Sequence, residues 1–354
     1  MDRRGFLKST SAAAALAATT TAATAKPDDA PIAAPAVNTH PTQEFRLGVA
    51  WAETVAGPAD LAHRLAIRIR EASDGRIRLS LDFKNSTDAE FIHSSEHTRA
   101  ALHPAFSYFA GLPASAGLNG LDLKAWISTG GGQDLWDRLA ADFGDKPLLA
   151  GHLGANPVLW SRREIEGGAG LRGLRIAVDG PTIDLARALG AAPHEVAPAR
   201  IAEALANGEV DAVEHSATLN SMAIGLPAAA RFAVTPSLTP AGTAIALRIR
   251  SNVWDKLGQA DQALISACAA EIYSISLSEA RFAENLLLET LGSRGGIHAR
   301  IMPSEVSTAL PHLSQAIVAA LSGHDVAARR VNASYMTFRR HLGHGNYRDD
   351  VPIA

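Results

Sequence analysis

Three residues near position 95 form a pattern that can bind a metal ion. His93, Glu96 and His97 spell HxxEH. On a helix, histidines four residues apart share one face and can hold zinc, while the glutamate acts as a general base for hydrolysis. The surrounding stretch 88–102 is mostly polar, however, and a solvated helix face accounts for the pattern equally well. The spacing provides no third ligand, so both interpretations stay open.

Two glycine-rich motifs could bind an anion. Residues 168–173 spell GxGxxG, which binds a dinucleotide only when it follows a strand and opens a helix. Here the glycines precede the strand expected over 174–178, so we predict a loop. The three glycines at 130–132 stand before a helix that starts near Gln133, where they could bind an anion or cap the helix. Neither GxSxG nor a P-loop lysine motif occurs.

The chain contains a single cysteine, Cys268. One cysteine excludes a disulfide framework, a CxxC redox pair and a cysteine-ligated cluster. Its neighbours form an apolar helix stripe, which favours a place in the core over a role as nucleophile. The sequence offers no convincing catalytic constellation, and we expect that the protein is not an enzyme.

The composition is that of a globular protein. The chain has 354 residues, a formal net charge of -3, a hydrophobic fraction of 47% and a charged fraction of 19%. These values exclude a disordered acidic chain, a collagen-like repeat and a basic nucleic-acid binder. At roughly 150 residues per domain, the length allows about two domains.

The first residues resemble an export signal. Arg3 and Arg4 are followed by Phe6 and Leu7, then by a mildly apolar stretch that ends in Ala23-Thr24-Ala25. This order is typical of a twin-arginine signal peptide over 1–25, with a disordered basic tail as the alternative. The proline-rich stretch 26–42 predicts a flexible tether. No other stretch has the ~20 apolar residues of a membrane span, so we expect a periplasmic protein.

Two regions predict strands next to helices. Residues 44–51 and 77–83 alternate apolar and polar residues, and an amphipathic helix opened by Pro58 lies between them. Strand, helix and strand in about forty residues predict a parallel sheet covered by helices. A second α/β region follows, with strands at 174–178 and 210–214 and helices at 182–189 and 199–206.

The last hundred residues predict mainly helices. A long helical stretch at 252–291 ends at glycines and is followed by a strand at 297–302. Two further helices are expected, at 304–321 and 325–342.

Short stretches spread over nearly the whole mature chain resemble the solute receptors of TRAP (tripartite ATP-independent periplasmic) transporters. The resemblance is strongest to the subgroup that binds 2-oxo acids. The segment GGGQ-x-LW at 130–136 is the most specific match, and the order and spacing of the others add to it. The further matching stretches are 64–69, 73–76, 108–111, 171–176, 204–212, 241–243 and 254–257.

The resemblance implies an α/β, two-lobed periplasmic solute-binding protein fold, with a cleft between the lobes and a long connecting helix. We expect lobe I at 43–163, with 248–303 returning to it, and lobe II at 164–247. The C-terminal helices then occupy 304–354.

The resemblance also implies positions for the binding site. In the subgroup, a glutamine and an arginine hold the substrate, and a glutamate, the following tryptophan and a later acidic residue hold a cation. These positions fall on Asn156, Ala177, Glu214, His215 and Pro240. We therefore expect Asn156, Glu214 and His215 to bind the ligand together with Tyr108. A bound cation would have Glu214 and His215 as ligands, and no other cofactor is expected.

The alanine at position 177 changes the expected ligand. An arginine clamps a carboxylate with two charge-assisted hydrogen bonds, and an alanine makes none. A carboxylate buried without that partner would lose several kcal/mol of binding energy. Arg175 and Arg248 are candidates to supply the charge instead. Without them, a ligand with neutral or cationic polar groups, or a larger acid that reaches another arginine, should bind better.

We therefore expect a periplasmic receptor that hands a small polar organic solute, a carboxylate among the candidates, to the permease subunits of a TRAP transporter. It would bind no nucleic acid and would be a monomer or a homodimer. Two alternatives remain. One is an exported enzyme, such as a metal-dependent hydrolase that uses His93 and His97. The other is a receptor fold that has lost carboxylate binding and acts as a sensor.

Overall fold

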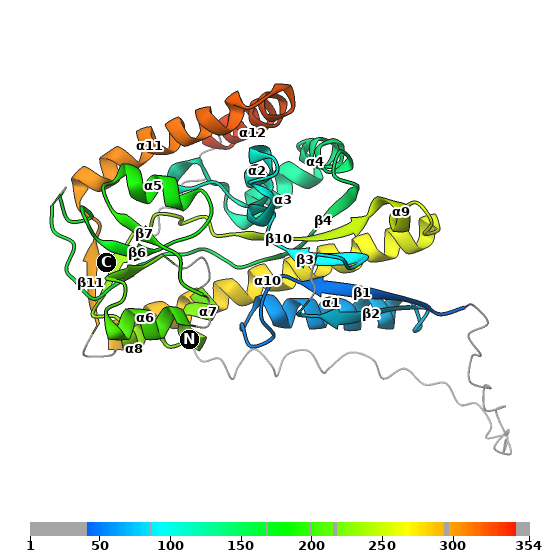
Figure 1. Cartoon of the computed structure of the whole chain (residues 1–354), viewed down its shortest axis with the longest axis horizontal. Coiled ribbons are helices and arrows are strands. Elements are labelled where there is room, and N and C mark those ends of the chain that lie inside the picture. Colours follow the sequence, from blue (N-terminus) through cyan, green and yellow to red (C-terminus); the bar gives the residue numbers. More distant parts are fainter. Residues whose placement is uncertain are drawn as a thin grey trace, which may run out of the picture. The chain divides into compact units, whose positions relative to one another are not determined.

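The computed structural model describes residues 41–84, 87–167, 169–197, 200–214, 218–293 and 297–344. The expected signal peptide at 1–25 and nearly all of the expected tether at 26–42 lie outside these residues. Two β-sheets with helices packed on them make up the described part of the chain (Figure 1). This confirms the predicted α/β fold class. None of the helices in these ranges combines the length and the apolar character that a membrane crossing needs.

The first sheet has five strands in the order β2-β1-β3-β10-β4. β1 runs parallel to β2 and β3, whereas β10 is antiparallel to β3 and β4. Its strands are β1 (Gln43–Val49), β2 (Ile77–Asp82), β3 (Phe91–Ser94), β4 (Asp145–His152) and β10 (Ala244–Arg250). The predicted strand–helix–strand unit at the start of the chain is therefore confirmed.

Helix α1 (Pro58–Ala72) connects β1 to β2 and shows why the prediction succeeded. Pro58 stands in the first turn, where its missing N–H costs nothing, and the carboxylate of Asp60 accepts a 3.0 Å hydrogen bond from the backbone N–H of Gly57. Leu61, Leu65 and Ile69 recur on one face and are buried against the sheet and against helix α10.

The second sheet has six strands in the order β11-β9-β5-β8-β6-β7. They are β5 (Leu159–Ser161), β6 (Arg175–Ala177), β7 (Ala192–His194), β8 (Ala212–Val213), β9 (Phe232–Thr235) and β11 (His298–Ile301). The helices between them are α5 (Thr182–Ala188), α6 (Ile201–Asn207), α7 (Thr218–Ala223) and α8 (Leu226–Ala229).

Three strands belong to a different sheet from the one that the expected lobe ranges implied. β5 falls in the range expected for lobe I but pairs with β8 and β9 in the second sheet. β10 begins at Ala244, inside the range expected for lobe II, but pairs in the first sheet. β11 pairs with β9, although 248–303 was expected to return to lobe I. The partners of these strands are distant in sequence, so local patterns could not assign them to a sheet.

The chain passes between the sheets at several points. Residues 153–158 lead from β4 to β5, and residues 236–243 lead from β9 to β10. We call these the first and the second crossing segment. The helical stretch predicted at 252–291 consists of α9 (Ser251–Trp254) and α10 (Gln259–Ser293). α10 packs on β4 and α1 and also contacts α7.

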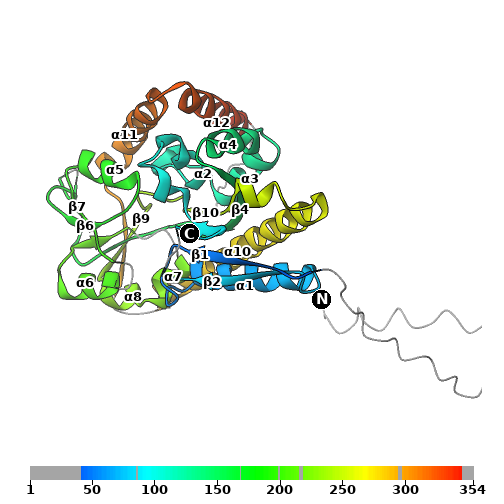
Figure 2. The ribbon, with the colours of Figure 1, turned by 45° about the vertical axis from the view of Figure 1, so that its right-hand side comes forward.

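Helices cover both faces of the first sheet (Figures 1 and 2). α1 and α10 pack on one face, in a cluster that contains Leu47, Leu247 and the buried Cys268. The other face carries an aromatic cluster in which Phe109 stacks on Trp136 at 5.0 Å between ring centroids. The helices on that side are α2 (Ser107–Ala110), α3 (Gly120–Ser128), α4 (Gly132–Ala141) and α12 (Val326–His344). α11 (Ser304–Gly323) precedes α12 and packs on α5.

Candidate functional site

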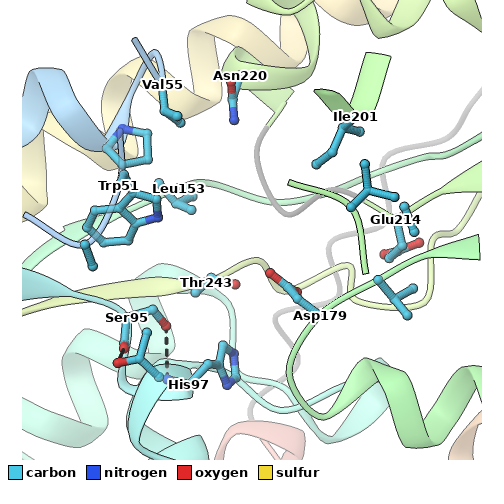
Figure 3. Close-up of a pocket in the computed structure, with 16 residues that line it drawn as sticks. Trp51, Val55, Ser95, His97, Leu153, Asp179, Ile201, Glu214, Asn220 and Thr243 are labelled. Carbon is cyan, nitrogen blue, oxygen red and sulfur yellow. Dashed lines mark hydrogen bonds between the residues drawn. The ribbon is translucent and has the colours of Figure 1, made fainter. Parts of the chain in front are cut away.

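A cavity of about 300 Å³ is lined by residues from both sheets and from both crossing segments (Figure 3). Trp51, which follows β1, and Ser95 and His97, which follow β3, come from the side of the first sheet. Ala177, Asp179 and Glu214 come from the side of the second sheet, at the ends of β6 and β8. Leu153 and Thr243 belong to the crossing segments. A ligand in this cavity would touch all these parts of the chain at once.

The lining of this cavity is mostly apolar and carries more acidic than basic groups. Asp179 and Glu214 are its carboxylates, and His97 is its one histidine among the described residues. Burial lowers the pKa of His97, and the nearby Asp179 acts against this shift. No arginine or lysine belongs to the lining in the described ranges. A neutral or cationic polar group therefore fits the cavity better than an isolated anion.

Glu214 is held by the protein itself. Its Oε1 accepts hydrogen bonds from Asn156 Nδ2 at 2.8 Å, from the backbone N–H of Thr239 at 2.9 Å and from Thr239 Oγ1 at 2.6 Å. Its Oε2 accepts one from the backbone N–H of Leu238 at 3.1 Å. Burial raises the pKa of Glu214, and these donors partly offset the rise. Glu214 therefore both lines the cavity and joins the two crossing segments.

The described residues around Glu214 do not fit a bound cation. Four donors already occupy most of the acceptor sites of its carboxylate. No group of three convergent His, Cys, Asp or Glu side chains in the described ranges includes it. Pro240, at which the resemblance implied the later acidic ligand, has no side-chain oxygen, and its carbonyl accepts a 3.2 Å hydrogen bond from the N–H of Asn156. His215 lies outside the described residues, and its expected roles in ligand and metal binding stay predictions.

Asn156 lies beside the cavity rather than in its lining. It is 1% exposed, and its amide is directed at Glu214. Its carbonyl accepts a 2.5 Å hydrogen bond from Ser237 Oγ. Asn156 therefore positions Glu214 and does not itself reach the cavity.

Tyr108 does not line the cavity, contrary to our expectation. Its side chain is 0% exposed in the aromatic cluster of the first sheet, and its ring packs against Tyr335. Its hydroxyl donates a 3.0 Å hydrogen bond to Asn332 Oδ1 on α12. This partner lies 224 residues away in sequence, so the aromatic stretch around Tyr108 gave no sign of it.

Neither arginine proposed to replace the missing charge faces this cavity. Arg175 makes a bidentate pair with Asp211, with Nη2–Oδ1 at 2.8 Å and Nε–Oδ2 at 3.1 Å. These hydrogen bonds lower the pKa of Asp211. Arg248 pairs with Asp145 and lines a different cavity.

The HxxEH pattern does not lie on one helix, contrary to the expectation for 88–102. His93 lies in β3, whereas Glu96 and His97 begin a short 3₁₀ helix, η2 (Glu96–Arg99). Glu96 is buried and accepts a 2.9 Å hydrogen bond from Trp136 Nε1, so it is not placed as a general base. His97 packs against Gly180, which follows β6 of the second sheet. A Cβ atom added to Gly180 would lie 3.3 Å from the imidazole ring of His97. His93 and Glu96 are therefore buried in the core, whereas His97 lines the cavity.

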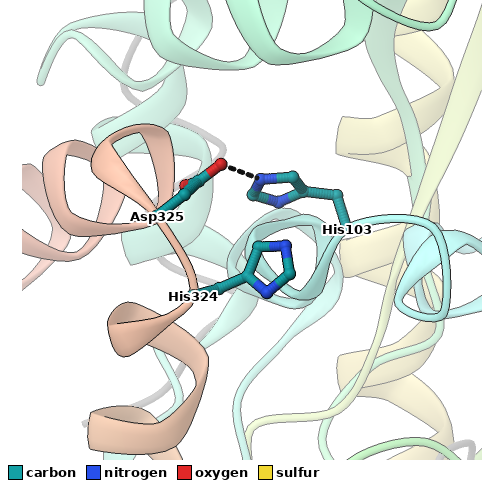
Figure 4. Close-up of side chains that lie close together, drawn as sticks. All are labelled: His103, His324 and Asp325. Carbon is teal, nitrogen blue, oxygen red and sulfur yellow. Dashed lines mark hydrogen bonds and ion pairs between the residues drawn. The ribbon is translucent and has the colours of Figure 1, made fainter.

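A different group of possible metal ligands lies where α11 meets α12 (Figure 4). Ligand atoms of His103, His324 and Asp325 lie within 4.8 Å of one another. The Nδ1 of His103 accepts a hydrogen bond from the N–H of Ala105 at 3.2 Å, so its proton is on Nε2, which donates to Asp325 at 3.0 Å. The His103 ring then has no lone pair directed at the group, and a hydrogen bond to Asp325, which also caps α12, accounts for the arrangement.

The glycine motifs are structural in the residues described. Gly170 and Gly173 belong to a loop before β6, as predicted, and Gly168 lies outside the described residues. Gly131 has φ +84° and is the N-cap residue of α4, in agreement with the capping role that the sequence allowed.

Several lining residues were missed from the sequence. Trp51, His97 and Asp179 all follow strands that run parallel within their sheets. The carboxyl ends of parallel strands meet at one edge, which is where α/β proteins bind ligands. This rule, applied to the predicted strands, could have identified Trp51 and Asp179.

Comparisons with known proteins identify the family and agree with the fold. The family model of bacterial extracellular solute-binding proteins, family 7, matches residues 119–322. A monocarboxylate 2-oxoacid-binding periplasmic protein of Nostoc sp. (strain PCC 7120) is 24% identical over 325 residues, which are 86% of this chain and 88% of that protein.

Two solved structures show the same fold. A TRAP transporter solute-binding protein from Bordetella bronchiseptica RB50, with calcium and picolinate in its active site, is 24% identical with a TM-score of 0.78, over 86% of this chain and 94% of that one. A TRAP periplasmic solute-binding protein from Colwellia psychrerythraea, with calcium and pyruvate bound, is 19% identical with a TM-score of 0.78, over 85% and 95%. The family match spans more than half of the chain. The chain therefore belongs to the bacterial extracellular solute-binding proteins of family 7.

Proposed function

We propose that this protein is the periplasmic receptor of a TRAP transporter, exported through a twin-arginine signal. It captures a small polar organic solute and presents it to the membrane permease subunits. The observation that carries this proposal is the cavity of about 300 Å³ whose lining comes from both sheets and both crossing segments. A solute bound there favours the arrangement in which the two sides lie close together, and a permease can recognise that arrangement.

The charge of the lining limits the choice of solute. Asp179 and Glu214 face the cavity, and Ala177 stands at the position where the resemblance to the 2-oxo-acid receptors implies an arginine. No described lining residue is an arginine or a lysine, and burial lowers the pKa of His97. An acid as short as pyruvate would have to leave water without a charged partner. We therefore propose that simple 2-oxo acids bind weakly, although relatives of this chain are named for such ligands.

A thermal-shift screen of the purified protein tests the proposal. A solute present at 100 times its Kd stabilises the native state by about 2.7 kcal/mol and raises the melting temperature. We expect stabilisation by solutes with hydroxyl, amide or amine groups, and little or none by pyruvate. Micromolar binding of pyruvate would contradict the charge argument. A protein that no polar organic solute stabilises would contradict the receptor function itself.

No observation on the described residues favours the alternative of an exported hydrolase. His93 and His97 lie on different elements, and Glu96 is hydrogen-bonded in the core. The family consists of solute-binding proteins. Metal analysis of the purified protein would separate the two functions. A hydrolase that uses His93 and His97 would contain zinc, whereas the receptor needs no zinc at these residues.

A further inference from the structure

A second cavity, of about 490 Å³, lies beside the first and has the opposite charge. The two share Ala50 and Thr98 in their linings, so they adjoin. The second cavity is lined by Arg99, Arg248 and Arg250, with Asp145 as the one carboxylate among its described lining residues. We call it the arginine cavity.

The first sheet places these arginines together. Arg248 and Arg250 are two residues apart on β10, so both side chains lie on the same face of the sheet. Arg248 pairs in register with Pro147 of β4 on one side and with Ile92 of β3 on the other, and Arg250 is opposite Asp145. Arg99 approaches the same point from η2, and its guanidinium lies 3.9 Å from the ring centroid of Phe106.

Positive charge exceeds negative charge in this cluster. The buried carboxylate of Asp145 is shared by all three guanidiniums, at 3.2 Å from Arg248, 3.0 Å from Arg250 and 3.4 Å from Arg99. Glu96 is the other acid in contact, at 3.4 Å from Arg99, and burial raises its pKa. Even with both acids ionised, three arginines face two carboxylates.

Within the described part of the chain, one buried donor of this cluster is unpaired, while Arg250 donates to Asp145 and to the backbone carbonyl of Thr87. Arg248 Nε is buried and has no hydrogen-bond partner among the described residues, while its Nη2 donates to Ser94 Oγ at 3.2 Å. Arg250 is 34% exposed, so the cluster is open to solutes from one side. An unpaired buried cation is costly, and guanidinium forks bind oxyanions with short, charge-assisted hydrogen bonds. The cluster is therefore suited to a carboxylate or phosphate group.

We propose that the arginine cavity binds an acid group, and that this group belongs to the transported solute. The solute is then elongated: its acid end lies on Arg248 and Arg250, and a neutral or cationic polar end lies near Asp179 and Glu214. Thr98 and Ala50 line both cavities and therefore lie between the two ends. This inference rests on the proposed function for the identity of the solute, but the anion site itself does not.

The anion site is tested with inorganic phosphate on the full-length protein. At constant ionic strength, phosphate should raise the melting temperature more than chloride does, and Arg250→Gln should weaken phosphate binding at least tenfold. Arg250→Lys keeps the charge and should keep part of the effect. Arg187→Gln is the matched control, because Arg187 is exposed and pairs only with Asp184 among the ion pairs of the described residues. An equal response of Arg250→Gln and the unmodified protein would overturn the anion site.

The elongated solute is tested with ω-amino acids of three to six carbons, compared with their carboxamides and with the fatty acids of equal length. At least one amino acid should bind ten times more tightly than its amide, and Arg250→Gln should remove most of that difference by weakening the amino acid far more than the amide. Equal binding of acid and amide throughout the series would show that the anion is not part of the solute. If no organic solute of any charge binds while phosphate still does, the proposed function fails and the anion site stands.

Discussion

The side-chain amide of Asn156 donates a hydrogen bond of 2.8 Å to Oε1 of Glu214. Asn156 belongs to the first crossing segment and Glu214 follows β8. Leu238 and Thr239 of the second crossing segment donate to the same carboxylate. One buried carboxylate thus ties together three parts of the chain at the point where it passes between the sheets. The polar group that the cavity exposes to a ligand is also a fixed point of the fold.

Glu214→Gln should therefore destabilise the protein. The glutamine amide replaces one acceptor oxygen with a donor, which then faces the N–H or O–H groups of Leu238 or Thr239. An unsatisfied buried donor costs about 1–3 kcal/mol, and we expect a loss of this size in the free energy of unfolding. Urea denaturation measures it. Glu203→Gln, at a side chain that is 61% exposed, is the control and should change the stability little. Equal stabilities of the two variants would show that the hydrogen bonds contribute nothing net.

Two glycines allow the crossing segments to touch. A Cβ atom on Gly242 would lie 1.6 Å from the carbonyl oxygen of Gly154, and Gly242 has φ +77°, a conformation that costs other residues energy. We expect Gly242→Ala to lower the free energy of unfolding by at least about 2 kcal/mol, because both the contact and the strain must be relieved. Gly323→Ala, where nothing lies within 4 Å of the added atom, should not destabilise. Chemical denaturation of both variants decides the point.

Stability should fall in mild acid because of buried histidines. Burial lowers the pKa of His93 to about 3 and that of His152 to about 4, so both are neutral in the folded protein at pH 5. In the unfolded chain they bind a proton below pH about 6.5. The free energy of folding that these neutral histidines contribute is therefore fully present above pH 6.5. It is lost as the pH falls toward their pKa values in the folded protein, by up to about 1.4 kcal/mol per pH unit for each histidine.

His93→Phe should reduce the slope of the free energy of unfolding against pH between pH 6.5 and 5, by the equivalent of about one bound proton. Urea unfolding at several pH values in this window measures the slope. Leu121→Gln, at an exposed side chain without a titratable group, is the control and should leave the slope unchanged. An identical slope in His93→Phe and the unmodified protein would mean that His93 does not stay neutral in the fold.

Much of the fold was accessible from the sequence because its elements carry their own signals. The apolar positions of α1 recur at helical spacing, and Pro58 marks its start. β1 and β2 alternate more buried and more exposed residues over most of their length. Each of these depends on residues close in sequence, which pattern reading can evaluate.

The rest depended on contacts between distant residues. β5 belongs to the second sheet because it pairs with β8 and β9, which lie more than fifty residues later in the chain. Tyr108 is buried because Asn332 and Tyr335 of α12 cover it. The arginine cavity combines Arg99, Asp145 and Arg248, which no local pattern connects. Such groupings appear only once the topology is known.

The decisive test of the ligand's charge is Ala177→Arg. Ala177 lines the cavity at the end of β6, is 4% exposed and adjoins Glu214 through a 2.9 Å backbone hydrogen bond. A guanidinium there supplies the bidentate partner that a short carboxylate lacks, so the variant should bind pyruvate at least ten times more tightly, a gain of about 1.4 kcal/mol. Ala177→Met, of similar length without charge, should gain nothing in calorimetric titration. If Ala177→Met gains as much, or the unmodified protein already binds pyruvate with micromolar affinity, charge at this position does not select the solute.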